Sequence, residues 1–162
     1  MERGEPSRQI PAVEVISGNH ILYRNCQKPE VPPRTRKIEE LSCVYGQPQW
    51  FFTKALFDGD INPIQHQLLI PRKSVENHLH TLLSGNEKLE DGIEVVVCDE
   101  DGKEFFMALK FWSKSPVLIK TWMEFLEEHR LQVDDTVTAW IFSRAGGQNQ
   151  RLPILMIIRR KL

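Results

Sequence analysis

Three histidines lie close enough in the sequence to suggest a metal site. His78 and His80 are two residues apart, and His66 precedes them by a short distance. Imidazole is a common ligand of zinc and other transition metals. Residues two apart on a helix do not share a face, however, and no Cys or Asp lies at a matching spacing. We therefore expect no metal site.

Cys98 and two pairs of aspartates are the other candidates for catalytic chemistry. Cys98 closes an apolar run of three valines, which predicts a buried, unreactive thiol rather than a nucleophile. Asp99 with Asp101, and Asp134 with Asp135, lie in turn-like sequence, so solvated turns explain them better than acid–base catalysis. The chain also lacks a glycine-rich phosphate loop, a Gly-x-Ser-x-Gly elbow and a His-Glu-x-x-His motif. These absences predict a binding protein that is not an enzyme and needs no cofactor.

The composition is that of an ordinary globular protein. The 162 residues are 41% hydrophobic and 27% charged, and no run approaches the ~20 apolar residues that span a bilayer. The first residues lack the apolar core of a signal peptide, and three widely spaced cysteines favour neither a disulfide framework nor a zinc module. We expect a protein that stays inside the cell with reduced thiols.

The distribution of charge is more informative than its sum. The formal net charge is −1, which argues against electrostatic binding of nucleic acid. Residues 105–123, however, contain Lys110, Lys114 and Lys120 and no acid, and residues 136–162 contain five basic residues and no acid. A nearly neutral protein can therefore still present one basic face.

The chain divides near residue 48. Residues 1–48 contain six of the ten prolines and only one short apolar stretch, which predicts a poorly ordered tail or linker. Residues 49–162 consist of short runs rich in β-branched and aromatic residues separated by turn chemistry, a pattern typical of a β-barrel or sandwich. The expected strands are Phe51–Leu56, His66–Ile70, Glu94–Cys98, Glu104–Trp112, Val117–Ile119, Val137–Phe142 and Ile154–Arg159. The last of these is apolar on both faces, so we expect it in the core.

Two helices and two turns complete the pattern. Thr121 and Glu124 have the spacing of a capping box at the start of one helix, and the other helix begins near Pro71. Asp99–Gly102 and Gly146-Gly147 predict turns. Because strands and helices do not alternate, a doubly wound sheet is excluded, and a mainly β, partly open barrel with helices at its ends fits better.

Two segments resemble the plant B3 DNA-binding domain. Residues 52–72 read FTKALFDGDINPIQHQLLIPR, where the family has a lysine-bearing strand, Ser-Asp-Val and an Asn-Arg-hydrophobic-Ile-Pro-Lys stretch. Residues 111–137 read FWSKSPVLIKTWMEFLEEHRLQVDDTV, where the family has an aromatic-rich strand, a polar loop, a helix with Trp and Phe, and Leu-x-x-Gly-Asp-x-Val. The order and spacing agree over about two-thirds of the chain. The amino-acid sequence of the first segment most resembles that of a little-characterised branch of the family.

The resemblance implies a seven-stranded open pseudobarrel with two short helices that grips the major groove of DNA with two arms. The first arm would be residues 60–72, and the second arm would be the loop after Trp112. Carried over by position, the DNA-contacting residues would be Lys54, Gln67, Arg72, Trp112, Ser113, Lys114, Ser115 and Lys120. Lys54 and Arg72 would hold phosphates, and Lys120 would lie near the DNA backbone. Lysine and serine suit phosphate contacts, and glutamine can pair with an adenine edge.

Some positions depart from the family pattern and leave alternatives open. His66 and Gln67 replace the Asn-Arg pair, Gly59 replaces Ser, and Asp134 replaces Gly. Gln67 is read either as a base contact or as a plain strand residue. Trp112 is read as part of the second arm or of the core, and Lys114 as a phosphate contact or an ordinary solvated lysine.

The leading hypothesis is a sequence-specific, nuclear DNA-binding domain of a plant transcription regulator. Its partners would be double-stranded DNA and other proteins, with no membrane and no small-molecule substrate. The alternative is a protein-interaction module on the same pseudobarrel with weak or no DNA binding. The charge of −1 and Gln67 favour the alternative, and the acid-free second arm favours DNA binding.

Overall fold

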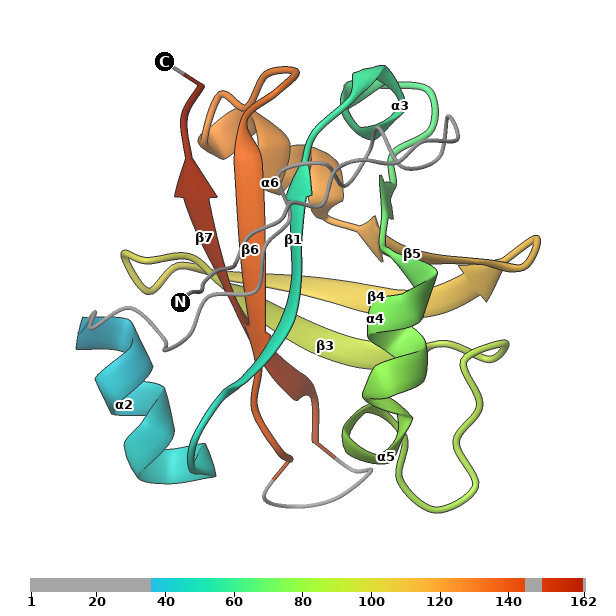
Figure 1. The fold of residues 1–162 in the computed structure, drawn as a ribbon, viewed down its shortest axis with the longest axis vertical. Helices are drawn as coiled ribbons and strands as arrows, with labels where there is room; N and C mark the ends of the chain where they lie inside the picture. Colours follow the sequence, from blue (N-terminus) through green and yellow to red (C-terminus); the bar gives the residue numbers. More distant parts are fainter. Residues whose placement is uncertain (1–35, 145–149, 162) are drawn as a thin grey trace, which may run out of the picture.

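A seven-stranded sheet forms the framework of the protein. The computed structural model describes residues 36–144 and 150–161. Its strands are β1 Gln49–Ala55, β2 Leu68–Leu69, β3 Ile93–Cys98, β4 Glu104–Trp112, β5 Ser115–Lys120, β6 Thr136–Ile141 and β7 Leu152–Arg159. They are ordered β1-β6-β7-β3-β4-β5-β2. Only the β3–β7 pair is parallel among the described pairs. The sheet curls into an open half-barrel (Figure 1), which confirms the predicted fold class.

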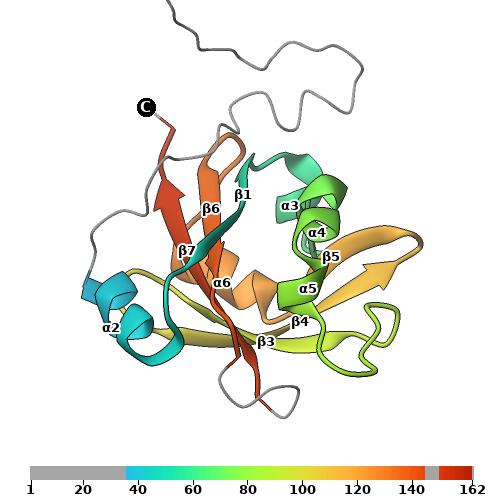
Figure 2. The same cartoon turned by 60° about the horizontal axis from the view of Figure 1, so that its bottom comes forward.

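Within the described residues, five short helices lie around the sheet. They are α2 Arg36–Tyr45, α3 Asp58–Ile61, α4 Arg72–Asn77, α5 Leu79–Leu82 and α6 Trp122–Glu128. In both Figure 1 and Figure 2, α2 lies on the opposite side of the molecule from α4, α5 and the β4–β5 hairpin. None of the helices within the described residues is long and apolar enough to cross a membrane.

The predicted order of the seven strands is confirmed, whereas α3 and α2 were not predicted. Two predicted elements also differ in extent. The strand expected at residues 66–70 is shorter, because His66 adopts a left-handed φ of 54° that strand backbone cannot continue. The helix expected after Pro71 is divided into α4 and α5 at His78. Gly102 has a φ of 92° in the β3–β4 turn, as expected, whereas Gly146-Gly147 lies outside the described residues.

The predicted capping box of α6 is wrong. Thr121 is the residue before the helix, but its side chain makes no capping bond. Its hydroxyl instead donates to the carbonyl oxygen of Phe106 on β4, at 3.1 Å. The helix is held by packing: Phe125 lies edge-on to Phe105 with ring centroids 5.0 Å apart, and Trp122 is fully buried. Tertiary contacts thus replace the local cap.

The core has two parts, one on each face of the sheet. Alternate residues of β6 and β7 face a large cluster inside the half-barrel, and the residues between them face a smaller cluster under α2. Ile38 and Leu41 of α2 are buried in that smaller cluster beside Trp140 and Leu155. Burial on both faces explains why residues 152–157 of β7 are all apolar and confirms the expected place of this strand in the core.

The packing of α2 corrects the predicted tail. Residues 36–45 were expected to belong to a poorly ordered segment, but they form a helix that covers one face of the sheet. The helix has few apolar residues, so its composition resembles that of a linker. The apolar residues that it does have lie on one face, which is the property that allows docking.

Candidate nucleic-acid interface

The second arm is the tip of the β4–β5 hairpin. Trp112 pairs with Ser115, and the two residues between them have positive φ values, 52° at Ser113 and 71° at Lys114. Left-handed conformations at both central positions define the type I′ turn, whose twist matches that of the strands. All three residues from Trp112 to Lys114 are exposed, and Trp112 is 56% exposed. Trp112 therefore belongs to the arm and not to the core.

The first arm leaves the end of β1 and returns to the sheet at β2. It contains the end of α3 and a loop with exposed Ile64 and His66. The backbone amide of Ile64 donates to the Asn62 side chain at 2.8 Å, which shapes the turn and leaves the Ile64 side chain 86% exposed. Gln67, immediately before β2, is partly buried. Nothing in the residues around Ile64 singles it out, because only its exposure in the structure distinguishes it from a core residue.

Strand pairing connects the two arms directly. β2 pairs with β5 through Leu68 opposite Leu118 and Leu69 opposite Val117. The backbone amide of Ile70 then donates to the carbonyl oxygen of Pro116 at 3.0 Å. The first arm is therefore attached to the strand that begins at the second arm, and the two arms share one edge of the sheet.

Arg72 lies beside the second arm. Its guanidinium is 5.9 Å from the centroid of the Phe111 ring, and Phe111 precedes Trp112 in β4. Arg72 is exposed and makes an ion pair with Glu76 one helical turn later, at 3.4 Å. An exposed pair of this kind is weak, so the guanidinium can still reach a phosphate. The structure thus places Arg72 next to Phe111, the residue that precedes the second arm.

Lys120 and Gln67 lie toward the other end of β5. Lys120 is five residues from Ser115, which corresponds to about 17 Å along a strand. Its ammonium group is 3.7 Å from Glu94 of β3, in an exposed pair. Gln67 precedes Leu68, so the antiparallel register places it toward the Lys120 end of the strand. The predicted contacts therefore form two groups, one at each end of the shared strand.

Lys54 is wrong as a phosphate contact. Its side chain is fully buried, with Nζ 2.8 Å from Oδ1 of the equally buried Asp60. It also donates to the carbonyl oxygen of Leu69 at 2.7 Å. An amine enclosed by the core and paired with a carboxylate cannot reach DNA. Lys54 was predicted to contact phosphate because of its position in the family motif. Only the tertiary structure shows that its partner is the buried Asp60.

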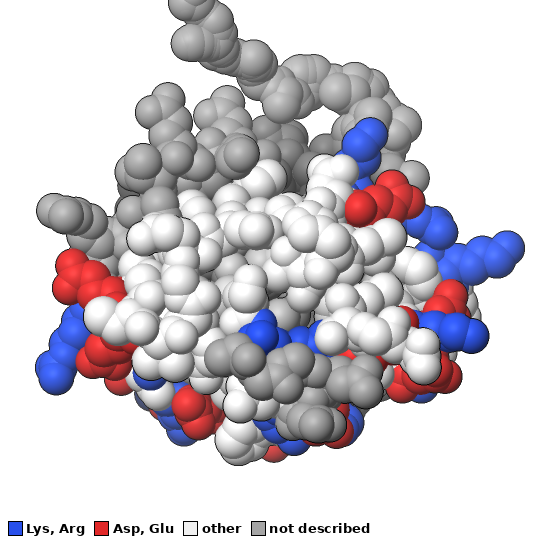
Figure 3. All heavy atoms as spheres, turned by 90° about the horizontal axis from the view of Figure 1, so that it is seen from below, with Lys and Arg blue, Asp and Glu red and all other residues white. Residues whose placement is uncertain are grey.

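The acid-free segment 136–162 contributes little unpaired basic charge. Four of its five basic residues are paired with acids from other segments: Arg144 with Glu87, Arg151 with Glu94, Arg160 with Asp135 and Lys161 with Asp134. By contrast, Lys114 of the second arm has no ion pair within the described residues. In Figure 3, Lys and Arg side chains extend on the side where the β4–β5 hairpin lies, among some acids. The tip of the second arm therefore presents a basic side chain that is not paired with an acid among the described residues.

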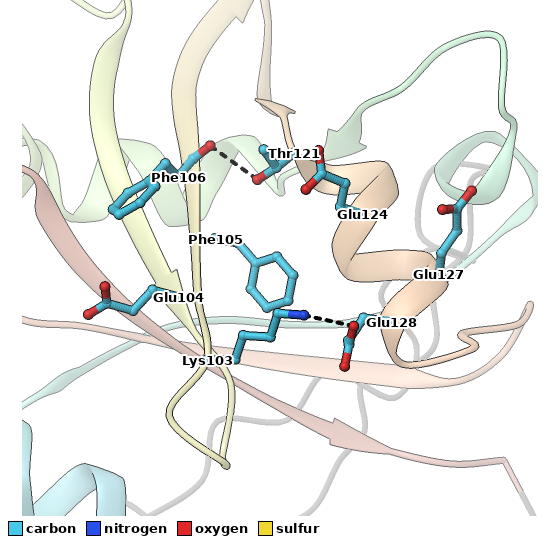
Figure 4. Close-up of a pocket in the computed structure, with 8 residues that line it drawn as sticks. All are labelled: Lys103, Glu104, Phe105, Phe106, Thr121, Glu124, Glu127 and Glu128. Carbon is cyan, nitrogen blue, oxygen red and sulfur yellow. Dashed lines mark hydrogen bonds and ion pairs between the residues drawn. The ribbon is translucent and has the colours of Figure 1, made fainter.

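A pocket between β4 and α6 has the opposite charge. It encloses about 480 Å³ and is lined by Lys103, Phe105, Phe106 and Thr121 and by Glu104, Glu124, Glu127 and Glu128 (Figure 4). The hydrogen bond from Lys103 to Glu128, 2.9 Å long, raises the pKa of Lys103 and lowers the pKa of Glu128. The other three carboxylates have no ion pair within the part of the chain that is described. This surface repels phosphate, so DNA cannot approach here.

The candidates for catalysis and metal binding do not form a site. Within residues 36–144 and 150–161, no three His, Cys, Asp or Glu side chains are placed to hold a metal ion. Cys98 is buried, as predicted, and burial raises the pKa of its thiol to about 11. Asp99 and Asp135 do lie in turns but are buried rather than solvated, because they accept backbone hydrogen bonds from Lys103 and Gln132.

Comparison with known proteins agrees with the arrangement of two arms on an open half-barrel. The family model described as "B3 domain-containing protein At2g31720-like" matches residues 36–151. The chain belongs to this B3 family. The matched range begins at α2, which supports the inclusion of this helix in the B3 domain.

Curated relatives cover a similar part of the chain. The B3 domain is 34% identical over 105 residues to the AP2/ERF and B3 domain-containing transcription factor RAV1 of Arabidopsis thaliana, with 64% of this chain and 29% of RAV1 aligned. It is 28% identical over 115 residues to the transcription repressor TEM1 of the same plant, with 67% of this chain and 31% of TEM1 aligned. The chain thus spans less than a third of the length of either relative.

Two solved structures share the fold. The Arabidopsis FUS3–DNA complex matches with a TM-score of 0.52 at 23% identity, covering 70% of this chain and all of that one. The Arabidopsis thaliana LEC2–DNA complex matches with a TM-score of 0.52 at 19% identity, covering 69% of this chain and 94% of that one. At these identities the likeness establishes the half-barrel fold.

Proposed function

We propose that this B3 domain binds double-stranded DNA sequence-specifically, as the DNA-reading part of a plant transcription regulator in the nucleus. The observation that carries the proposal is the pairing of β2 with β5, which holds two exposed polar arms on one sheet edge. A two-stranded ribbon such as the β4–β5 hairpin fits the width of the major groove. RAV1 and TEM1 are transcription proteins by name, and the FUS3 and LEC2 structures are complexes with DNA, which supports the same function here.

The two ends of the shared strand have different roles in this proposal. At the second arm, Arg72, Lys114 and the hydroxyls of Ser113 and Ser115 contact phosphates, and exposed Trp112 packs against the DNA surface. At the other end Gln67 reads a base edge, with Lys120 near the backbone. A well-placed bidentate glutamine contact discriminates between bases by about 1–3 kcal/mol. Lys54 makes no contact with DNA.

The proposed activity requires neither catalysis nor a cofactor. Binding depends on hydrogen bonds and ion pairs to a duplex, so the domain has no substrate to convert. Protein partners would bind outside the two arms. The small number of unpaired basic residues predicts that affinity depends only weakly on salt concentration, because few counterions are released.

Selection from a random duplex library at a stated salt concentration tests the proposal. We expect a short motif to be enriched by the full chain, and the same motif to be bound more tightly than a shuffled duplex in a direct binding assay. Absence of enrichment, with only salt-sensitive binding of equal strength to all duplexes, would contradict sequence-specific recognition. It would favour a protein-interaction module on the same fold.

A further inference from the structure

A buried ion pair lies at the base of the first arm. The side chains of Lys54 and Asp60 are both fully enclosed, and Nζ and Oδ1 are 2.8 Å apart. The Phe57 ring covers the ammonium group, with its centroid 4.6 Å from Nζ. Burial raises the pKa of Asp60, and the charge and hydrogen bond of Lys54 oppose that change. Neither group is exposed to contact a ligand.

The pair joins the two ends of the first arm. Lys54 donates to the carbonyl oxygen of Leu69 at 2.7 Å, and Asp60 Oδ1 accepts the amide of Leu69 at 3.3 Å. Asp60 Oδ2 accepts the amide of Phe57 at 3.1 Å. Asp60 lies at the start of the first arm, and Leu69 lies at the end of its loop. The Lys54–Asp60 pair therefore closes the loop, and we call this pair the clasp.

The clasp also connects the arm to the rest of the half-barrel. Lys54 lies in β1, where it is in register with Val137 of β6. The indole nitrogen of buried Trp122, at the start of α6, donates to the carbonyl oxygen of Asp60 at 2.8 Å. Leu69 belongs to β2 and is opposite Val117 of β5. Three elements that otherwise reach the arm from different directions therefore meet at Asp60: β1 and β2 at its carboxylate, and α6 at its backbone carbonyl group.

Stability alone does not explain this arrangement. Taking two charges out of water costs free energy, and replacing such a pair by apolar residues of similar size often leaves a protein equally stable or more so. What apolar residues cannot do is bind the amides and the carbonyl group of the arm in one geometry. Buried polar groups of this kind can select one conformation among several.

We propose that Lys54 and Asp60 are positioning residues that set the place of the first arm relative to the second. The inference rests on the proposed DNA binding for its functional consequence, since Gln67 lies within the loop that the clasp closes. A contact between Gln67 and a base edge requires the loop to be held in place before DNA arrives. Lys54 acts through Leu69 and Asp60, and not through contact with DNA.

The double variant Lys54→Met/Asp60→Leu tests the inference, because it removes both charges and retains apolar bulk. Amide hydrogen exchange without DNA is expected to accelerate at residues 61–69 and to remain slow in β6 and β7. Affinity for the selected duplex is expected to fall about tenfold, the usual effect of losing one well-placed base contact. The dependence of affinity on salt should keep its slope, because no phosphate contact is lost.

The matched control is Lys103→Met/Glu128→Leu, which removes an exposed pair of the same charges beside the acidic pocket. This control should change neither the rate of amide hydrogen exchange in the first arm nor the affinity for DNA. If Lys54→Met/Asp60→Leu does not fold, Asp60→Asn, which retains the shape, should still speed exchange at Leu69.

Unchanged exchange at residues 61–69 would overturn the positioning role, and so would full DNA affinity in a folded Lys54→Met/Asp60→Leu variant. A decreased salt slope would show instead that Lys54 contacts phosphate. Failure of the wild-type chain to enrich any duplex would contradict the proposed function, and the exchange measurement would still decide whether the clasp holds the arm.

Discussion

Arg144 binds both carboxylate oxygens of Glu87, a residue 57 positions away in the sequence. The two hydrogen bonds are 3.0 and 2.6 Å long, and Arg144 also donates to the carbonyl oxygen of Leu82 at 3.0 Å. Only 4% of the Arg144 side chain is exposed. An arginine that appears in an acid-free segment is thus a structural link between the end of β6 and the loop after α5.

Glu87→Gln should reduce stability at neutral pH by about 1–2 kcal/mol, because it removes a partly buried, two-pronged ion pair. The hydrogen bond from Arg144 lowers the pKa of Glu87 below 4.5 in the folded protein. The stabilisation is therefore fully present above pH 4.5 and is lost as the pH falls through the lowered pKa. Urea unfolding of both proteins from pH 7 to pH 3 measures the effect.

Exposed Glu90 provides the control for this ion pair. Glu90→Gln should leave the free energy of unfolding nearly unchanged at every pH. If the free energy of unfolding of Glu87→Gln varies with pH as that of wild type does, the Arg144–Glu87 ion pair does not stabilise the fold.

Lys114→Ala should weaken binding to all duplexes alike. Lys114 lies at the tip of the second arm with no ion pair among the described residues, so its loss removes one phosphate contact. The slope of the logarithm of affinity against the logarithm of salt concentration should fall by about one unit. Lys103→Ala, on the acidic pocket, should leave the slope unchanged. Equal slopes for wild type and Lys114→Ala would mean that this lysine does not contact a DNA phosphate.

Gln67→Arg should change which base is preferred. Glutamine matches the N7 acceptor and N6 donor of adenine, whereas arginine matches the O6 and N7 acceptors of guanine. We expect the enriched motif to shift from adenine to guanine at one base pair, with stronger binding to unrelated duplexes from the added charge. Both proteins should be selected against the same library at equal salt. An identical motif would mean that Gln67 does not read DNA.

Leu41→Ala should destabilise the domain by about 2–3 kcal/mol, because Leu41 is buried between α2 and the sheet. Val44 on the same helix is 65% exposed, so Val44→Ala should change the free energy of unfolding little. Chemical denaturation of the three proteins compares them directly. Equal stability would mean that α2 does not contribute to the fold.

Removal of residues 1–35 should leave a cooperatively folding B3 domain, because residues 36–45 supply the apolar contacts of this end. Removal of residues 1–48 should expose the cluster around Trp140 and lower the melting temperature. Circular dichroism of the two shortened chains distinguishes them. Unfolding of the chain that lacks only residues 1–35 would show that the earlier segment is part of the domain.

Cys98 should resist thiol reagents until the protein unfolds. With a pKa of about 11, about one molecule in a thousand carries the reactive thiolate at pH 8, and the side chain is buried. Exposed Cys43 should react at the rate of a free thiol. The measurement uses a Cys26→Ser variant, with Cys26→Ser/Cys43→Ser as its control. Rapid labelling of that control at pH 8 would contradict the burial of Cys98.

Strand positions could be predicted well because each depends on local pattern. The runs around Val95 and Ile154, and the turn at Gly102, have apolar spacing and backbone requirements that hold in any context. Helix ends were predicted less well: Thr121 has a capping-box spacing, but a carbonyl group on β4 is available to its hydroxyl. The α2 helix was missed because its two buried residues are too few to stand out in a proline-containing segment.

The sequence by itself determined the order of the seven strands and the fold family, since these depend on residues close together in the chain. The tertiary structure alone decided which charges are available. Lys54 and Lys114 are the same residue type and were both selected as DNA contacts, yet one is fully buried against Asp60 and the other is exposed at a hairpin tip. Charge depends on partners and solvent, and folding brings those partners from distant segments, so spacing along the chain cannot reveal them.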